Sequence, residues 1–296
     1  MPHASGDELP GLVLDLSRLL PGPLCGRMLA AMGYRVLRLL PPGGDWLDRI
    51  APDAAAWLRS GVECETVDLK SPGGRERLRG LVAQASVLLE NHLPGRMEAW
   101  EVGPEALRQI NAELVYVRLA GSRDPGARAL PGHDLTYLAS AGLLPRLESA
   151  ARQPPLADLC SAFWAALAVE RGLRRGGGFY EVYLEEAAWP AAWPPIPGLD
   201  GSRCNYAVYP ARSGRVALAA LEPHLWTRVC AAAGHPEWEP HAHARARAGE
   251  AVYDAICGWL RTRPADEWDA WAAAERLPLR AVKEHSPEPA APWIVR

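Results

Sequence analysis

The sequence predicts an α/β protein, in which a doubly wound parallel-sheet domain precedes a smaller α+β domain. Three observations support this fold class. Short aliphatic segments alternate with helix-like segments over roughly the first 185 residues, which is the pattern of repeated βαβ units. A stretch rich in Pro, Trp and Ala at residues 189–197 then interrupts the alternation. The segments after it are typical of a hairpin followed by helices.

The first βαβ unit lies at residues 11–40. Residues 11–16 are almost wholly aliphatic and predict a buried strand, while residues 35–40 predict a second one. Between them, residues 24–32 have helical spacing, with Gly33 at the C′ position. The same order recurs, and it predicts strands at 65–69, 85–89, 114–119 and 179–184, with helices at 71–83 (Ser71 as N-cap), 104–111, 133–144 and 158–173.

Beyond the Pro-rich stretch, residues 206–209 and 215–221 predict two strands joined by a turn. Helices are expected at 225–233 and 249–261. We therefore expect a large domain at residues 1–190, a small α+β domain at 198–275 and an extended C-terminal segment at 276–296.

Composition excludes several classes of function. The net charge of −3 gives no basic field for nucleic acid. The six cysteines contain no CxxC pair, which argues against a zinc site or a disulfide framework. The sequence contains no apolar run of about 18 residues, which is the length needed to cross a bilayer. The N-terminus also lacks a signal-peptide pattern. We expect a cytoplasmic protein that needs no metal or other cofactor.

Three titratable residues stand in short segments of small, apolar or turn-forming residues: His133, Asp158 and Glu222. Together they are suited to proton transfer. Each also has a purely structural interpretation. His133 can be a helix N-terminal residue, Asp158 a helix N-cap after two prolines, and Glu222 a solvated turn at a strand end. The pair His241 and His243 is expected in a solvated loop and not at a metal.

Four sequence blocks, in order and at matching spacing, resemble the CaiB/BaiF family, which holds the class III CoA-transferases and the α-methylacyl-CoA racemases. The blocks lie at residues 13–23 (Val-Leu-Asp-Leu-Ser-Arg-Leu-Leu-Pro-Gly-Pro), 67–74 (Val-Asp-Leu-Lys-Ser-Pro-Gly-Gly), 87–95 (Val-Leu-Leu-Glu-Asn-His-Leu-Pro-Gly) and 107–134, which ends in Gly-His-Asp. The resemblance implies a two-domain subunit in an interlocked homodimer. It places the active site between one subunit's large domain and its partner's small domain.

The resemblance also implies an acyl-CoA thioester as substrate. In the racemase branch, His133 and Asp158 would be the two acid/base groups on opposite faces of a planar enolate, and Glu222 would orient His133. A backbone N–H near Asp134 would stabilise the enolate oxygen. Asp134 and Tyr137 would line the thioester pocket.

In the transferase branch, Asp158 would instead be the nucleophile that attacks the thioester. The pattern Gly-His-Asp-x-x-Tyr-Leu-Ala at residues 132–139 resembles the racemase branch, and the short chain agrees with it. We therefore expect an acyl-CoA racemase or epimerase, with a class III CoA-transferase as the alternative.

The segment at 58–65 departs from the family, because it holds one arginine and two acids where relatives carry a basic run for the CoA phosphates. The block at 91–95 also lacks an arginine that is frequent in the family. The remaining candidates for binding CoA are Arg38, Arg59, Lys70, Asn91 and Arg96. These departures leave a third alternative open, namely a non-catalytic paralogue or one that binds a thioester on a carrier protein.

Overall fold

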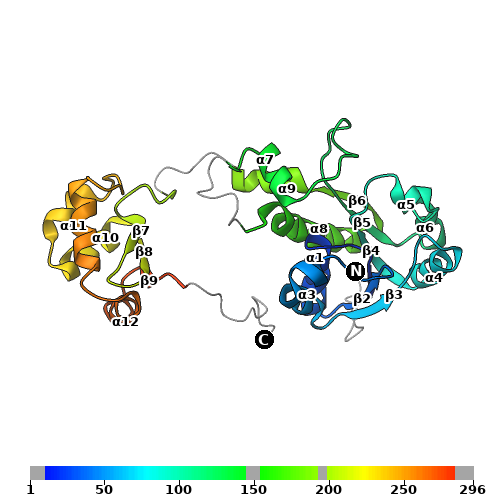
Figure 1. Cartoon of the computed structure of the whole chain (residues 1–296), viewed down its shortest axis with the longest axis horizontal. Helices are drawn as coiled ribbons and strands as arrows, with labels where there is room; N and C mark the ends of the chain where they lie inside the picture. Colours follow the sequence, from blue (N-terminus) through cyan, green and yellow to red (C-terminus); the bar gives the residue numbers. More distant parts are fainter. Residues whose placement is uncertain (1–10, 145–153, 193–198, 284–296) are drawn as a thin grey trace, which may run out of the picture. The chain divides into compact units, whose positions relative to one another are not determined.

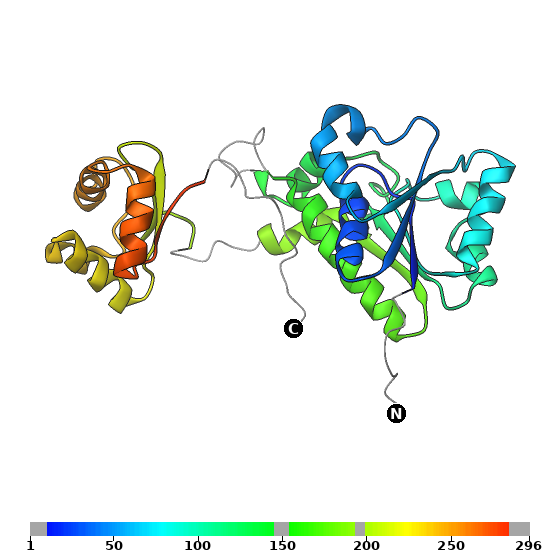
Figure 2. The ribbon, with the colours of Figure 1, turned by 90° about the horizontal axis from the view of Figure 1, so that it is seen from below.

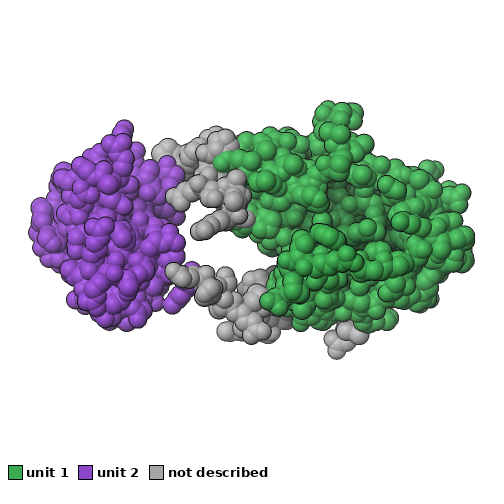
Figure 3. Space-filling view, in the orientation of Figure 1, with its two compact units in different colours: residues 1–193 green, residues 194–296 purple. Residues whose placement is uncertain are grey.

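The computed structural model describes residues 11–144, 154–192 and 199–283. Contacts divide the chain into two compact units, residues 1–193 and 194–296, which are coloured separately in Figure 3. Each unit has its own sheet and its own hydrophobic core.

Unit 1 is built on a six-stranded parallel sheet (Figure 1). In chain order its strands are β1 (Leu12–Asp15), β2 (Arg35–Leu40), β3 (Glu63–Thr66), β4 (Ala85–Glu90), β5 (Val115–Ala120) and β6 (Gly178–Tyr183). Their spatial order is β3-β2-β1-β4-β5-β6. The order reverses between β1 and β4, which makes the carboxyl ends of these two strands the topological switch point of the sheet.

Helices cover both faces of this sheet (Figures 1 and 2). One face packs against α1 (Pro21–Ala31), α3 (Pro52–Arg59) and the long α8 (Leu156–Arg174). The other face packs against α4 (Pro72–Val82), α5 (Arg96–Ala99) and α6 (Pro104–Ile110). The short helices α2 (Leu47–Ile50), α7 (Asp134–Ser140) and α9 (Leu184–Ala192) complete the unit. Since both faces are covered, the central strands are mostly apolar, and the charged residues on them, such as Arg118 of the fully buried β5, are paired.

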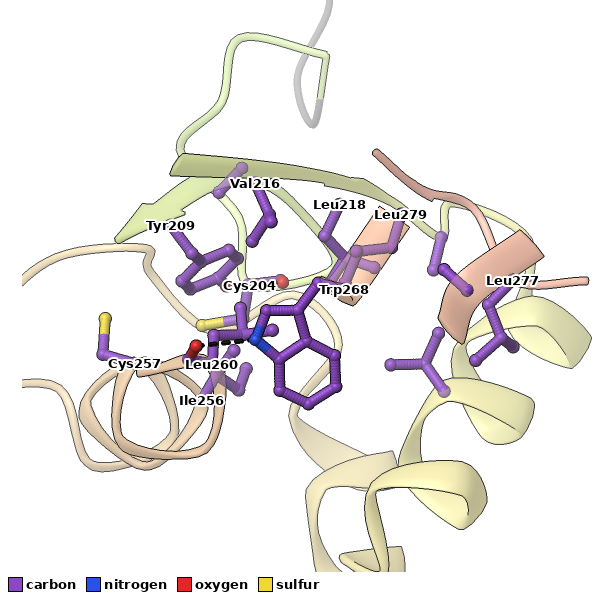
Figure 4. Packing of buried hydrophobic residues seen from close by; sticks show 14 of the residues in the cluster. Cys204, Tyr209, Val216, Leu218, Ile256, Cys257, Leu260, Trp268, Leu277 and Leu279 are labelled. Carbon is purple, nitrogen blue, oxygen red and sulfur yellow. Dashed lines mark hydrogen bonds between the residues drawn. The ribbon is translucent and has the colours of Figure 1, made fainter. Parts of the chain in front are cut away.

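Unit 2 packs helices on one side of a three-stranded antiparallel sheet. The strands are β7 (Tyr206–Pro210), β8 (Arg215–Ala219) and β9 (Leu279–Ala281), and the helices are α10 (Pro223–Ala233), the 3₁₀ helix η3 (Pro236–His241), α11 (Ala251–Leu260) and α12 (Ala265–Glu275). Trp268 lies in the middle of this core, where its indole Nε1 donates to the Leu260 carbonyl at 2.7 Å (Figure 4). Burial of the indole N–H therefore leaves no unsatisfied donor there.

The predicted α/β fold class is confirmed, and so are two details of local structure. Ser71 Oγ accepts from the Gly74 amide at 3.0 Å, as an N-cap should. Gly33 has a φ of 95° after the last residue of α1, a conformation that favours glycine.

Several element boundaries differ from expectation. The third strand ends at Thr66 instead of residue 69, because Asp68 Oδ1 accepts from the Lys70 amide and turns the chain. The expected linker at 189–197 begins inside α9, which continues past Pro190 because Ala187 and Ala188 are buried in the packing with α8. Residues 193–198 lie outside the described part of the chain.

The expected extended segment at 276–296 also needs correction in its first part. Residues 279–281 form β9 and pair antiparallel with β8, where Leu279 is the partner of Leu218. Both leucines are buried, so this short strand closes the core of unit 2. Residues 284–296 lie outside the described part.

Candidate active site

A cleft of about 960 Å³ opens in unit 1 at the carboxyl edge of the parallel sheet. Its walls come from the segments that follow β1, β2, β3, β4 and β5, together with α7, the first turn of α8 and the start of α9. This is where a doubly wound sheet binds its ligands, since the strand order reverses between β1 and β4.

The structure places His133, Tyr137 and Asp158 in this cleft. His133 is the N-cap residue of α7, with its amide donating to Thr136 Oγ1 at 3.1 Å and its side chain exposed. Asp158 is the third residue of α8, which begins after Pro155. Asp158 is therefore not the N-cap of its helix, and its carboxyl group lines the cleft.

Burial raises the pKa of Asp158 to about 7, and the neighbouring Asp134 carboxylate adds to the shift. Taking a carboxylate out of water disfavours its charged form, and a second negative charge nearby acts in the same direction. A carboxyl group with a pKa near 7 both accepts and donates a proton at neutral pH, as general acid–base chemistry requires.

Tyr137 is held by two glycines in the segment between β5 and α7. A Cβ atom at Gly121 would lie 2.6 Å from the Tyr137 hydroxyl, and one at Gly132 would lie 2.7 Å from it. Neither distance is possible for a real side chain. The absence of side chains at both positions therefore makes the space that the Tyr137 ring occupies beside Asp158.

Asp134 does not line the cleft, contrary to expectation. Its Oδ1 accepts from the Asp158 amide at 3.0 Å, and the Ala157 amide also hydrogen-bonds to this carboxylate. These amides belong to the first turn of α8. The carboxylate of Asp134 thus faces a helix N-terminus instead of the cleft.

Four cations line the cleft, and two of them were predicted. Lys70 and Arg96 lie there as expected, but Arg18 and Arg49 were missed. A signal for Arg18 existed, because it lies in the loop that follows the first strand, three residues after Asp15. Arg49 lies over the ring of the exposed Trp46, with 5.3 Å between the guanidinium carbon and the ring centroid.

Arg38 and Arg59 are not available to a ligand of this cleft, so their assignment to CoA binding needs correction. The Arg38 side chain is only 2% exposed, lies 3.7 Å from Asp15 and is hydrogen-bonded to Asp45. Arg59 is hydrogen-bonded to Asp48 and stands outside the cleft lining. Both arginines balance acids of unit 1.

The two acids of the divergent segment also lie away from the cleft. Glu63 pairs with Arg35 at 2.9 Å, and Glu65 pairs with Arg77 at 2.8 Å, along the edge strand β3. They line a separate shallow depression with Cys64. Glu63 and Glu65 are therefore not part of the cleft lining that Lys70 and Arg96 share.

Asn91 lines the cleft, and its amide group connects two loops. Its Oδ1 accepts from the Arg18 amide and its Nδ2 donates to the Arg18 carbonyl, both at 2.9 Å. The side chain of Asn91 thereby fixes the loop after β1 to the end of β4, on the two sides of the switch point.

An aromatic group in the cleft was also missed. His92 packs edge-on against Trp100, with ring centroids 5.4 Å apart, and Arg96 lies over the same indole. Burial, together with the positive charges of Arg18, Arg96 and Arg118, lowers the pKa of His92 to about 4. His92 is therefore neutral at physiological pH and adds no charge to the cleft.

Glu222 belongs to unit 2, where its backbone carbonyl accepts from the Leu225 and Trp226 amides at the start of α10. Its side chain is exposed. Its predicted role toward His133 stays a prediction. Among the described residues, no group of three or more His, Cys, Asp or Glu side chains is placed to hold a metal ion. None of the helices in residues 11–144, 154–192 and 199–283 has the length and hydropathy to cross a membrane.

Comparison with known proteins identifies relatives of this chain. The chain is 32% identical to human α-methylacyl-CoA racemase over 241 residues, which cover 72% of this chain and 61% of the racemase. It is 28% identical to the succinyl-CoA:mesaconate CoA-transferase of Haloarcula hispanica over 293 residues, covering 84% of this chain and 74% of that enzyme. This chain thus spans about three fifths of the length of the human racemase.

The fold comparison agrees. A solved structure of a hypothetical protein from Mycobacterium tuberculosis superposes with a TM-score of 0.76 at 25% identity, covering 95% of this chain and 84% of that one. The family model of CoA-transferase family III matches residues 11–178 and 183–291, which include nearly all of both units. The chain therefore belongs to CoA-transferase family III, the CaiB/BaiF family.

Proposed function

We propose that this chain is an α-methylacyl-CoA racemase-like enzyme, which transfers a proton at the α-carbon of an acyl thioester. The observation that carries the proposal is the cleft shared by the imidazole of His133 and the carboxyl group of Asp158, whose pKa burial raises to about 7. One of them takes the α-proton, and the electron pair of the C–H bond moves into the thioester carbonyl to give an enolate. The other returns a proton to the opposite face of the α-carbon, so that no co-reactant is consumed.

The acyl group is proposed to be carried by CoA, because the cleft offers cations for its phosphates. Arg18, Arg49, Lys70 and Arg96 all line it. Of the acids along the same walls, Asp45 is already neutralised by the buried Arg38. A surplus of positive charge at the carboxyl edge of the sheet is suited to charge-assisted hydrogen bonds with phosphate oxygens.

A class III CoA-transferase is the second candidate function. It is favoured by the 28% identity to a succinyl-CoA:mesaconate CoA-transferase, a match that covers more of this chain than the racemase match does. In that chemistry the Asp158 carboxylate attacks the thioester and CoA leaves as a thiolate. The position of Asp158 in the cleft is compatible with this role as well.

We further propose that the chain works as an interlocked homodimer, in which Glu222 from one copy orients His133 of the other. The outer face of α8 supports self-association, because Phe163, Trp164 and Leu167 are 56%, 50% and 60% exposed on it. Large apolar side chains that gather on one helix face are typical of interfaces. The exposed carboxylate of Glu222 is available for such a contact.

The decisive experiment is incubation of the protein with a single epimer of a 2-methylacyl-CoA in D₂O, followed by NMR of the α-position. The racemase proposal predicts deuterium at the α-carbon and formation of the other epimer without any acceptor acid. His133→Ala and Asp158→Asn should each abolish the formation of the other epimer. The matched control is Asp53→Asn, which removes an exposed carboxylate on α3 and should leave the exchange unchanged.

Other outcomes assign the chain differently. Turnover only in the presence of a carboxylate acceptor, with a covalent adduct on Asp158, would replace the racemase proposal by the transferase. If neither reaction occurs while CoA binds, the chain is a non-catalytic member of the family. A failure to bind CoA at all would contradict the proposed carrier of the acyl group.

A further inference from the structure

The helix that carries Asp158 is capped by a side chain from another helix. The residue at the N-cap position of α8 is Pro155, which has no side-chain oxygen. Asp134, the first residue of α7, supplies one, since its carboxylate accepts from the amides of Ala157 and Asp158. Four amides at a helix N-terminus lack partners within the helix, so this contact satisfies two of them.

The same carboxylate lies beside the cleft residue whose backbone it holds. The Asp158 amide and Asp134 Oδ1 are 3.0 Å apart. Burial raises the pKa of the half-buried Asp134 carboxyl group above its usual value, and the hydrogen bonds donated by the Asp158 and Ala157 amides act in the opposite direction. The positive end of the α8 dipole also favours an anion at this place.

Among the described residues, Asp134 is the one titratable neighbour whose charge acts on the pKa of Asp158, beside the larger effect of burial. From α7, Tyr137 is a neutral phenol whose pKa is raised by burial and by the charges of Asp158 and Glu185. On α8 itself, burial and Asp134 raise the pKa of the Cys160 thiol, which stays neutral. His133 lines the same cleft. From α9, Glu185 acts on Tyr137. Asp134 is the neighbouring charge that raises the pKa of Asp158.

We propose that Asp134 is a positioning residue for the reaction, which fixes the backbone of Asp158 by capping α8 and places its own carboxylate charge next to this residue. This inference rests on the proposed proton-transfer function and deepens it. It also explains why the residue next to His133 is an aspartate that does not face the cleft.

Two substitutions separate the two parts of this role. Asp134→Asn keeps an oxygen acceptor for the α8 amides and removes the charge. Asp134→Ala removes both the acceptor and the charge. In Asp134→Asn the pKa of Asp158 should fall by about one unit, because the charge of Asp134 that disfavours ionisation of Asp158 is removed. The midpoint of urea unfolding should stay near that of the wild type in Asp134→Asn and should fall in Asp134→Ala.

The direct measurement is a ¹³C NMR titration of the protein labelled at its aspartate carboxyl carbons, with the Asp158 signal assigned by its loss in Asp158→Asn. This readout needs no turnover. Asp124→Asn, which removes an exposed loop carboxylate, should leave the Asp158 titration in place. The second readout is the pH profile of kcat/KM for α-deuterium exchange, whose acid limb should move to lower pH by the same amount in Asp134→Asn.

The inference and the proposed function can fail separately. An unchanged Asp158 midpoint in Asp134→Asn overturns the inference, whether or not the wild type exchanges α-protons. A lowered midpoint in a protein that catalyses no exchange supports the electrostatic role of Asp134 and overturns the racemase proposal. A lowered midpoint with a shifted acid limb supports both.

Discussion

Glu90 and Arg118 occupy paired positions on the adjacent strands β4 and β5, and the Arg118 guanidinium donates to the Glu90 carboxylate where both side chains are almost closed to solvent. Arg118 also contacts Glu98 of α5 at 2.7 Å and Glu181 of β6 at 3.9 Å. One guanidinium thus balances acids from three elements just below the cleft. Burial raises the pKa of Glu90 even with this partner present, so the carboxylate depends on Arg118 to stay ionised.

Replacing Arg118 by Met should therefore destabilise unit 1 in a pH-dependent way. Removing one partner of a buried pair costs about 3–5 kcal/mol, because the other charge is left without compensation. Glu90 has a raised pKa in the folded state, and the loss of Arg118 raises it further, so the folded protein binds a proton more readily than the unfolded chain does. The penalty should then be largest near pH 8 and smaller near pH 5.5, as urea unfolding at both values would measure.

A matched exposed pair serves as the control. Arg79→Met removes an ion pair with Glu76 whose partners are 31% and 78% exposed, and such pairs contribute about 0–1 kcal/mol. An equal loss of the free energy of unfolding in both variants would contradict the account of a buried charge network. So would a loss in Arg118→Met that does not depend on pH.

Asp158→Asn should increase the free energy of unfolding at alkaline pH and leave it nearly unchanged at pH 4. The carboxyl group has a pKa of about 7 in the folded protein and an ordinary value of 3.8. Because the folded state holds the proton more tightly, ionisation of Asp158 costs stability as pH rises from about 4 to 7, and the cost persists above 7. Three pKa units set an upper bound of about 4 kcal/mol on this gain.

Urea unfolding of Asp158→Asn and wild type at pH 4.5 and 8.5 tests this expectation. Asp53→Asn, in which an exposed carboxylate on α3 is lost, should change the free energy of unfolding by a similar small amount at both pH values. If the free energy of unfolding of Asp158→Asn exceeds that of the wild type by no more at pH 8.5 than at pH 4.5, Asp158 ionises at little cost in the folded protein. That result would contradict a raised pKa for Asp158.

The sheet could be predicted from the sequence for a physical reason. Parallel strands covered on both faces are mostly apolar, and short, largely apolar segments such as 85–89 and 114–119 stand out in the sequence. The carboxyl ends of such strands meet at one edge, and the structure places Lys70, Arg96 and His133 in the cleft there. These three residues were expected at a site from the family resemblance and not from the strand pattern.

Side-chain partners could not be predicted in the same way. Arg38 was expected to bind phosphate, but its side chain is buried between Asp15, its register partner on β1, and Asp45 from the loop after β2. Asp134 was expected in the pocket, but it caps α8. Both outcomes depend on strand register and on the mutual orientation of two helices, which are tertiary properties that local spacing does not specify.

Lys70→Ala and Arg96→Ala should each weaken the binding of CoA about tenfold, while Arg59→Ala should not. A hydrogen bond to a charged group contributes about 1.5 kcal/mol, which corresponds to roughly that factor. Lys70 and Arg96 line the cleft, and Arg59 is hydrogen-bonded to Asp48 outside it.

Isothermal titration with CoA at 50 and 300 mM salt measures the affinity of each variant. The affinities of the two cleft variants should also depend less on salt than that of the wild type. An Arg59→Ala variant that loses as much affinity would place the phosphates at α3 instead.

The space for Tyr137 offers a prediction that separates packing from chemistry. Gly121→Ala should lower kcat/KM for the α-proton exchange by tenfold or more, on the order of what a displaced catalytic-site group costs, because the new methyl group would lie 2.6 Å from the Tyr137 hydroxyl and must move the ring. The φ of Gly121 is outside the left-handed region, so alanine strains no backbone there. The whole effect should then arise from contact with Tyr137.

In a Tyr137→Ala background, Gly121→Ala should therefore have almost no additional effect, as a double-mutant cycle would reveal. Gly73→Ala, which meets no atom within 4 Å, is the matched control and should leave the rate unchanged. Independent, additive losses from Gly121→Ala and Tyr137→Ala would show that Gly121 acts on the cleft by some route other than the tyrosine.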